Sequence, residues 1–160
     1  MISLNLAHNL RDNHEEVVRR WLENLHGNIA DDFEQMMNTP MGSGVSHKLL
    51  GCAVDFLEAE EYRKAEVLHG MRDIARDAAF RRAAVGFGLP DIVTTAVAFR
   101  QALQETLLEN SAHGSIENER ALTEAVIALN VFGDVLVSGE IAGYFAYNDY
   151  RDDESAKDAA

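Results

Sequence analysis

Apolar residues recur at helical spacing along almost the whole chain, and no convincing run of strict alternation indicates a strand. The pattern predicts an all-α fold, a single-domain bundle of about six to seven helices that could resemble a globin without haem. The helices are expected near residues 4–10, 12–26, 33–37, 43–57, 61–84, 90–110 and 115–148.

Turn and capping residues mark several of these boundaries. Asp12, with Glu15 three residues later, has the capping-box arrangement that opens a helix. The segment Asn38-Thr39-Pro40-Met41-Gly42 is expected to be a turn, after which Ser43 or Ser46 opens the next helix. Between the first two boundaries lies a clear apolar stripe with Trp21 in its middle, so Trp21 is expected to be buried.

The last predicted helix, which Ser115 is expected to cap, is long for a globular protein, and its apolar residues do not share one stripe. Val131 and Val135 are among those that lie off the main line. Gly139 and Gly143, four residues apart, would let a second helix approach closely. Either the domain itself covers both sides of this helix, or two chains form a twofold homodimer through it. We expect the dimer.

The composition describes one globular domain with an acidic surface. The chain has 160 residues, which fits a helical domain over residues 1–148, followed by a polar, acidic tail over 149–160 that is expected to be disordered. The formal net charge of −13 disfavours nucleic acids and anionic membranes as partners. A single cysteine, no signal peptide and no long apolar run together predict a cytoplasmic protein without membrane insertion.

Two Glu-x-x-His sequences, Glu23 to His26 and Glu66 to His69, have the spacing of ligands in di-iron helical bundles. Metal ligands must point into the bundle. At about 100° per residue, Glu23 points almost opposite to the stripe around Trp21, and Glu66 and His69 fall outside the apolar face of their helix. We therefore expect no metal site, no haem and no other cofactor, and a purified protein that is colourless and free of iron.

Catalytic motifs are absent from the sequence as well. Cys52 lies in an apolar stretch, where a small buried side chain is the usual role, and His47 is not on its face. No nucleophile elbow, phosphate-binding loop or dinucleotide fingerprint is present. The chain is therefore expected not to be an enzyme.

One local basic cluster, which consists of Arg72, Arg76, Arg81 and Arg82, interrupts the acidic balance. Arg72 and Arg76 are four residues apart and share a helix edge that could receive a carboxylate or phosphate of a ligand or partner. The alternative, which the interleaved Asp73 and Asp77 favour, is a charged outer face with weak local ion pairs.

Several segments resemble the RsbRD-type N-terminal sensory domain, a helical module found ahead of regulatory domains in stressosome co-antagonists and ahead of some histidine kinases. The segment from Phe33 to Gly42 is similar to its Phe…Asn-Pro-x-Gly turn, with Thr39 inserted between the Asn and the Pro. Further similar segments are 17–22, 71–80, 89–93 and 99–103.

The resemblance covers about residues 4–148 and implies a stand-alone sensory or regulatory module that acts through a protein partner of a signalling pathway. It supplies no catalytic residues. The phosphorylatable or kinase part that would give the output is expected on another polypeptide. The alternative is a helical bundle that binds a small molecule, haem or a di-iron centre and has a redox or gas-sensing role.

Overall fold

The computed structural model describes residues 4–25, 27–110 and 116–159, and it confirms the all-α fold. The described residues form seven helices and no strand. The helices are α1 (Leu4–Asp12), α2 (His14–Glu23), α3 (Asn28–Met37), α4 (Pro40–Glu58), α5 (Glu61–Ala84), α6 (Leu89–Asn110) and α7 (Ile116–Asp158). Ser115, the expected cap of the last helix, and His26, of the first Glu-x-x-His sequence, lie outside the described residues.

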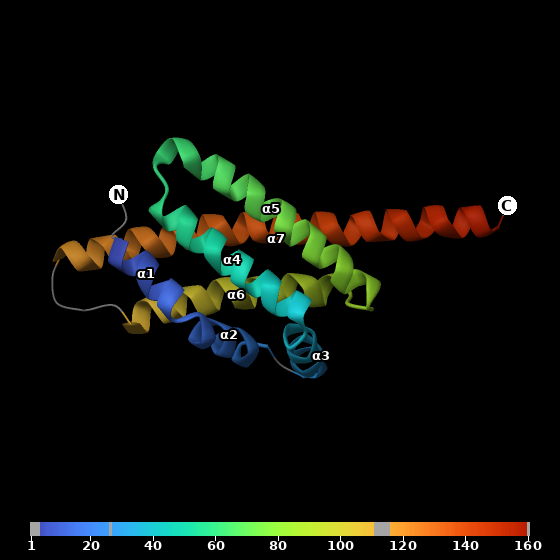
Figure 1. Ribbon diagram of the computed structural model, residues 1–160, viewed down its shortest axis with the longest axis horizontal. Helices are drawn as coiled ribbons and strands as arrows, with labels where there is room; N and C mark the ends of the chain where they lie inside the picture. Colours follow the sequence, from blue (N-terminus) through green and yellow to red (C-terminus); the bar gives the residue numbers. More distant parts are fainter. Residues whose placement is uncertain (1–3, 26, 111–115, 160) are drawn as a thin grey trace.

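Helix α7 is the axis of the bundle, and the other long helices pack along it (Figure 1). Its most extensive contact is with α5, followed by α6, while α4 packs against both α5 and α7. Helices α1 and α2 cover α6 and α4, and α3 lies against the beginning of α4. The C-terminal part of α7 projects beyond the other helices (Figure 1).

Small residues allow α5 and α7 to lie close together. A Cβ atom built on Gly143 would lie 2.1 Å from the carbonyl oxygen of Arg76, and one built on Gly139 would lie 2.9 Å from that of Arg72. The expectation that these two glycines receive a second chain is therefore wrong, because α5 of the same chain already occupies this face. Whether the protein forms a homodimer elsewhere remains a prediction.

Two expected helix starts are corrected. Asp12 ends α1, and α2 begins at His14 after Asn13, without a side-chain cap bond. Helix α4 begins at Pro40 instead of at a later serine, because the Thr39 hydroxyl accepts a hydrogen bond from the Gly42 N–H at 3.1 Å. The same hydroxyl donates to the carbonyl oxygen of Met36 at 2.6 Å, so Thr39 ties the end of α3 to the start of α4.

The expectation of a disordered tail over 149–160 is wrong for the described residues to 158, which continue α7. Residues after Gly143 include neither glycine nor proline. Extending an existing helix fixes one residue for each hydrogen bond gained, so a polar segment can stay helical without a core to bury. An ion pair between Lys157 and Glu154, at 2.9 Å and one turn apart, adds a small contribution.

Helix α7 also contains an 18-residue window with a mean hydropathy of 1.6, long and apolar enough to cross a membrane by length and composition. The sequence-based expectation that no such stretch exists is therefore wrong. Only 39% of the window is buried inside the bundle. A single helix of this kind is weak support for a span, because core helices of soluble proteins pass the same test.

Candidate functional site

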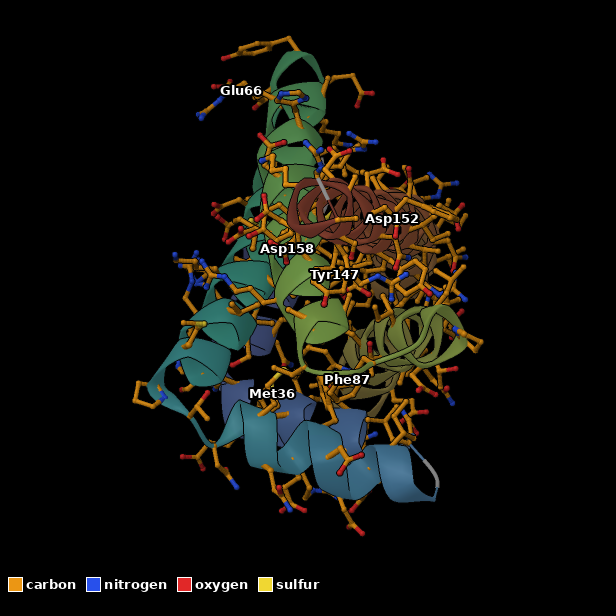
Figure 2. The ribbon with its side chains drawn as sticks, turned by 90° about the vertical axis from the view of Figure 1, so that its right-hand side faces the viewer. Met36, Glu66, Phe87, Tyr147, Asp152 and Asp158 are labelled. Atoms are coloured by element: carbon orange, nitrogen blue, oxygen red, sulfur yellow. The ribbon has the colours of Figure 1, made fainter. Side chains whose placement is uncertain are left out.

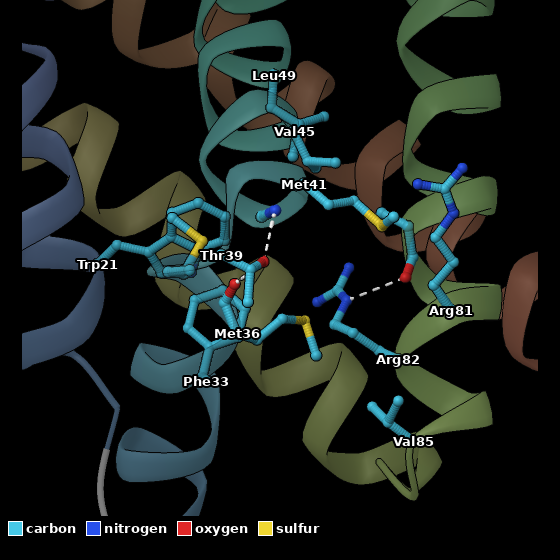
Figure 3. A pocket seen from close by; sticks show the side chains of 13 residues that line it. Trp21, Phe33, Met36, Thr39, Met41, Val45, Leu49, Arg81, Arg82 and Val85 are labelled. Carbon is cyan, nitrogen blue, oxygen red and sulfur yellow. Dashed lines mark hydrogen bonds between the residues drawn. The ribbon is translucent and has the colours of Figure 1, made fainter.

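An apolar pocket of about 140 Å³ lies where α3 and the beginning of α4 meet α2 and α5 (Figure 3). Its wall includes two aromatic rings and three methionines. The lining residues are Trp21, Phe33, Met36, Met37, Thr39, Met41, Gly42, Val45, Leu49, Ala78, Arg81, Arg82 and Val85.

Trp21 forms a rigid part of the wall, and its predicted burial is confirmed. The indole Nε1–H donates a hydrogen bond to the carbonyl oxygen of Thr95, at 2.8 Å. Its ring centroid lies 4.9 Å from that of Phe33 and 4.5 Å from that of Phe99, both in tilted arrangements. Because one hydrogen bond and two aromatic contacts hold the indole ring, it gives the pocket a defined surface.

In contrast to the rigid Trp21 ring, the methionines are flexible, and the mouth of the pocket is exposed to solvent. Met36 and Met41 have unbranched, flexible side chains that can adapt to the shape of an apolar ligand. Met41 is 58% exposed and Val85 68% exposed, so apolar groups face solvent at the rim. Large exposed apolar groups beside a cavity are typical of a binding site.

Arg82 brings a buried positive charge into this apolar wall. It is 4% exposed, and its guanidinium donates to the Thr95 hydroxyl at 2.5 Å and to the Ala78 carbonyl oxygen at 3.4 Å. It also forms a buried ion pair with the carboxylate of Glu140. Its Cζ atom lies 6.0 Å from the centre of the Phe33 ring. A buried arginine is stable only with such partners, because desolvating an unpaired charge is costly.

Glu140 links the pocket to α7. It is 1% exposed, and its second carboxylate oxygen, Oε2, has no hydrogen-bond partner among the described residues. Burial raises the pKa of this carboxyl group, although the positive charge of Arg82 opposes the shift. The wall of the pocket is thus bonded directly to the helix that leaves the bundle.

Arg81 stands at the same wall but is half exposed, and it pairs with Asp77 one turn earlier at 2.9 Å. An open depression beside the pocket shares Met36, Thr39 and Val85 with it. Among its described lining residues, that depression carries Asp32 and Asp91 and no basic residue.

Of the basic cluster predicted from the sequence, Arg81 and Arg82 line the pocket, whereas Arg72 and Arg76, the two expected ligand contacts, do not. Arg72 packs its side chain over Gly139, and Arg76 borders a separate shallow depression on α5 and α7. Glu23, Glu66 and His69 are exposed, as their helical phase predicts, and Figure 2 shows Glu66 pointing away from the bundle. Among the described residues, no three His, Cys, Asp or Glu side chains lie close enough together to hold a metal ion.

The sequence placed Arg82 in the basic cluster without predicting its burial or its role in a site, and Glu140 was missed altogether. A signal for each was present. Arg82 continues the buried face of α5 through Ala75 and Ala78, and Glu140 lies one turn after Leu136 on the buried stripe of α7. A charged residue on an apolar stripe needs a buried partner of opposite charge. The stripe of α5 carries Arg82 and the stripe of α7 carries Glu140.

Two other groups with chemical potential lie elsewhere. The rings of His14 and His47 are stacked with centroids 3.7 Å apart at the junction of α2 and α4. Cys52 is half-buried, and burial, with a smaller contribution from Asp55, raises the pKa of its thiol. The raised pKa favours the unreactive thiol form.

Comparisons of the chain with protein families, with curated proteins and with solved structures found no significant match. The resemblance to the RsbRD-type sensory domain therefore remains a prediction from the sequence. The pocket and the buried ion pair beside it are the structural features that indicate a function.

Proposed function

We propose that this chain is a non-enzymatic sensory module of the RsbRD N-terminal type that binds a small, mainly apolar molecule and acts through a protein partner. The observation that carries the proposal is the apolar pocket whose buried Arg82 is bonded to Glu140 of α7. Apolar pockets with a few polar groups are the usual form of small-molecule sites.

The segment behind the family resemblance supports this proposal. Residues 33–42 supply six of the pocket's lining residues, from Phe33 to Gly42. Thr39 holds the end of α3 against the start of α4 inside this segment. A ligand between these helices would therefore contact the part of the chain that resembles the sensory family.

The ion pair offers a route by which binding could reach a partner. A ligand shifts an equilibrium only if it binds one arrangement better than another. A molecule that fills the pocket contacts Arg82, and any change in the Arg82 side chain alters its bond to Glu140. Because α7 projects beyond the bundle (Figure 1), a change in its packing can be read by a protein bound to that part.

Thermal unfolding of the full chain with a set of small apolar molecules tests the proposal. A ligand that binds only the folded state adds about 2.7 kcal/mol at 100 times its Kd, so the midpoint temperature should rise with ligand concentration. Val45→Phe places a ring in the pocket and should abolish the rise. Val97→Phe, at an exposed position of α6 outside the pocket, is the matched control and should keep it. The proposal fails if no molecule in the set stabilises the protein.

A further inference from the structure

The charged residues in the pocket wall are all of one sign. Among the described residues that line the pocket, Arg81 and Arg82 are charged, and no Asp, Glu, Lys or His belongs to the lining. The chain as a whole has 27 acidic residues against 14 Lys and Arg. Each arginine pairs with a carboxylate outside the lining, Arg81 with Asp77 and Arg82 with Glu140. The described lining itself therefore offers guanidinium donors and no acidic group, which favours a ligand with a negatively charged acceptor.

Arg82 retains hydrogen-bonding capacity toward the pocket. A guanidinium carries five N–H hydrogens in total. In the described part of the chain, Nε bonds to Ala78, Nη1 to Thr95 and Nη2 to Glu140, one bond each. The second hydrogens of Nη1 and Nη2 are left for a further acceptor. Figure 3 shows the Arg82 guanidinium reaching into the space between Met36 and Met41.

The volume sets the size of the ligand. A dry cavity of about 150 Å³ lined by aliphatic and aromatic side chains binds a benzene ring. The pocket of about 140 Å³ thus accepts one six-membered ring or a short branched chain. Its partly open mouth, beside the exposed Met41 and Val85, leaves room for a small substituent.

We propose that the ligand is a small monocarboxylic acid whose ring or short chain packs against Trp21, Phe33 and the methionines and whose carboxylate pairs with Arg82. This inference rests on the proposed function, since it names the ligand class of the same pocket. Guanidinium groups recognise carboxylates through two parallel N–H bonds, and such bonds are strongest where water is excluded.

Glu140 allows the site to keep its charge balance. Arg82 and Glu140 together are neutral, so a ligand carboxylate adds one negative charge. Glu140 is buried with an unpartnered oxygen and a raised pKa, so it can take up a proton and offset that charge. Arg82 of α5 is the charged group that acts on Glu140, and Thr95 of α6 beside them is uncharged. Protonation would loosen the bond between the pocket wall and α7.

Binding of three probes to the full chain at neutral pH tests the ligand class. The probes are benzoate, toluene and benzylamine, which share one ring and differ in charge. Trp21 is the single tryptophan and lines the pocket, so its fluorescence reports binding, with calorimetry as a second readout. We expect benzoate to bind about 10-fold to 100-fold more tightly than toluene, the effect of hydrogen bonds to a charged group, and benzylamine to bind weakest.

The double variant Arg82→Leu/Glu140→Leu removes the charge pair without leaving a buried unpaired charge. It should lose the preference for benzoate and keep toluene binding, whereas Arg63→Leu, an exposed arginine of α5 outside the pocket, should change neither. Unchanged benzoate affinity in the double variant would overturn the inference. If the double variant does not fold, the ranking of the three probes on the natural chain decides.

The outcomes separate the two proposals. Toluene binding as tightly as benzoate, or more tightly, overturns the carboxylate inference and leaves the proposed function in place. If none of the three probes binds, the carboxylate inference fails, and the proposed function fails with it only if no other small apolar molecule stabilises the protein.

Discussion

At the scale of single residues, Trp21 is buried in the core and lines the pocket. Its ring packs against Phe33 and Phe99, and its N–H is bonded to Thr95. We expect Trp21→Ala to lower the free energy of unfolding by about 3–5 kcal/mol, the usual cost of removing a large buried aromatic. Trp21→Phe keeps a ring and loses the hydrogen bond, so it should cost clearly less. Denaturant unfolding measures both, and a loss below about 1 kcal/mol for Trp21→Ala would contradict the packing.

Substitutions of Arg82 and of Glu140 should have strongly non-additive effects on the free energy of unfolding, because the two side chains form an ion pair. Arg82→Leu leaves a buried carboxyl group without its partner and should cost about 3–5 kcal/mol. The double variant with Glu140→Leu replaces the pair by apolar side chains and should recover most of this loss. A double-mutant cycle based on urea unfolding gives the coupling free energy. Additive losses in the double variant would show that the two groups do not act as a pair.

The lowered pKa of His14 predicts that the stability of the protein depends on pH. Burial lowers the pKa of His14, the neighbouring His47 lowers it further, and Glu15 opposes the shift. The folded state therefore binds a proton at His14 less readily than the unfolded state, whose pKa is near 6.5. Stability from this group is full above that pH and decreases as the pH falls through 6.5 toward the lowered folded pKa.

The measurement is the free energy of unfolding at a series of pH values between 5 and 8, the range around the ordinary histidine pKa of about 6.5. His14→Gln should flatten the profile in this range. His47→Gln, which removes a repelling neighbour, should flatten it in part. A profile that stays the same in His14→Gln would assign the pH dependence to other groups.

At the scale of helices, the contact between α5 and α7 depends on glycine. Gly143→Ala places a methyl group 2.1 Å from the carbonyl oxygen of Arg76, so the two helices must separate. We expect a loss of about 1–3 kcal/mol, typical of overpacking a tight contact. Gly70→Ala in α5 is the control, because its Cβ meets nothing within 4 Å. It should stabilise the helix by about 0.5–1 kcal/mol. Equal effects of the two substitutions would contradict this account.

At the scale of the whole molecule, self-association must use a face other than the one with the glycines. Ile127 is 58% exposed and Val131 47% exposed on α7. We expect a twofold dimer through this face, and Ile127→Asp/Val131→Asp should return it to a monomer near 17.7 kDa with little change in monomer stability. Val97→Asp, exposed on α6, should leave the dimer intact. Light scattering decides, and a monomeric natural chain at all micromolar concentrations would exclude the dimer.

Local patterns in the sequence were sufficient to predict the helices and to predict whether many side chains point into the bundle or toward solvent. Helical spacing predicted all seven helices, the burial of Trp21 and the exposure of Glu23, Glu66 and His69. These properties depend on the angle of a residue around the axis of its own helix. They need no knowledge of the neighbouring helix.

The tertiary structure alone decided which surfaces meet. Arg82 and Glu140 are 58 residues apart, and the apolar pattern of α5 does not indicate that the partner of Arg82 lies on α7. The same holds for Gly143, whose small size indicates a close approach but does not choose between α5 and a second chain. The pocket needs side chains from α2, α3, α4 and α5 at once. Periodicity gives the direction of a side chain from its own axis, whereas the partner depends on how the axes pack, which is set by long-range contacts.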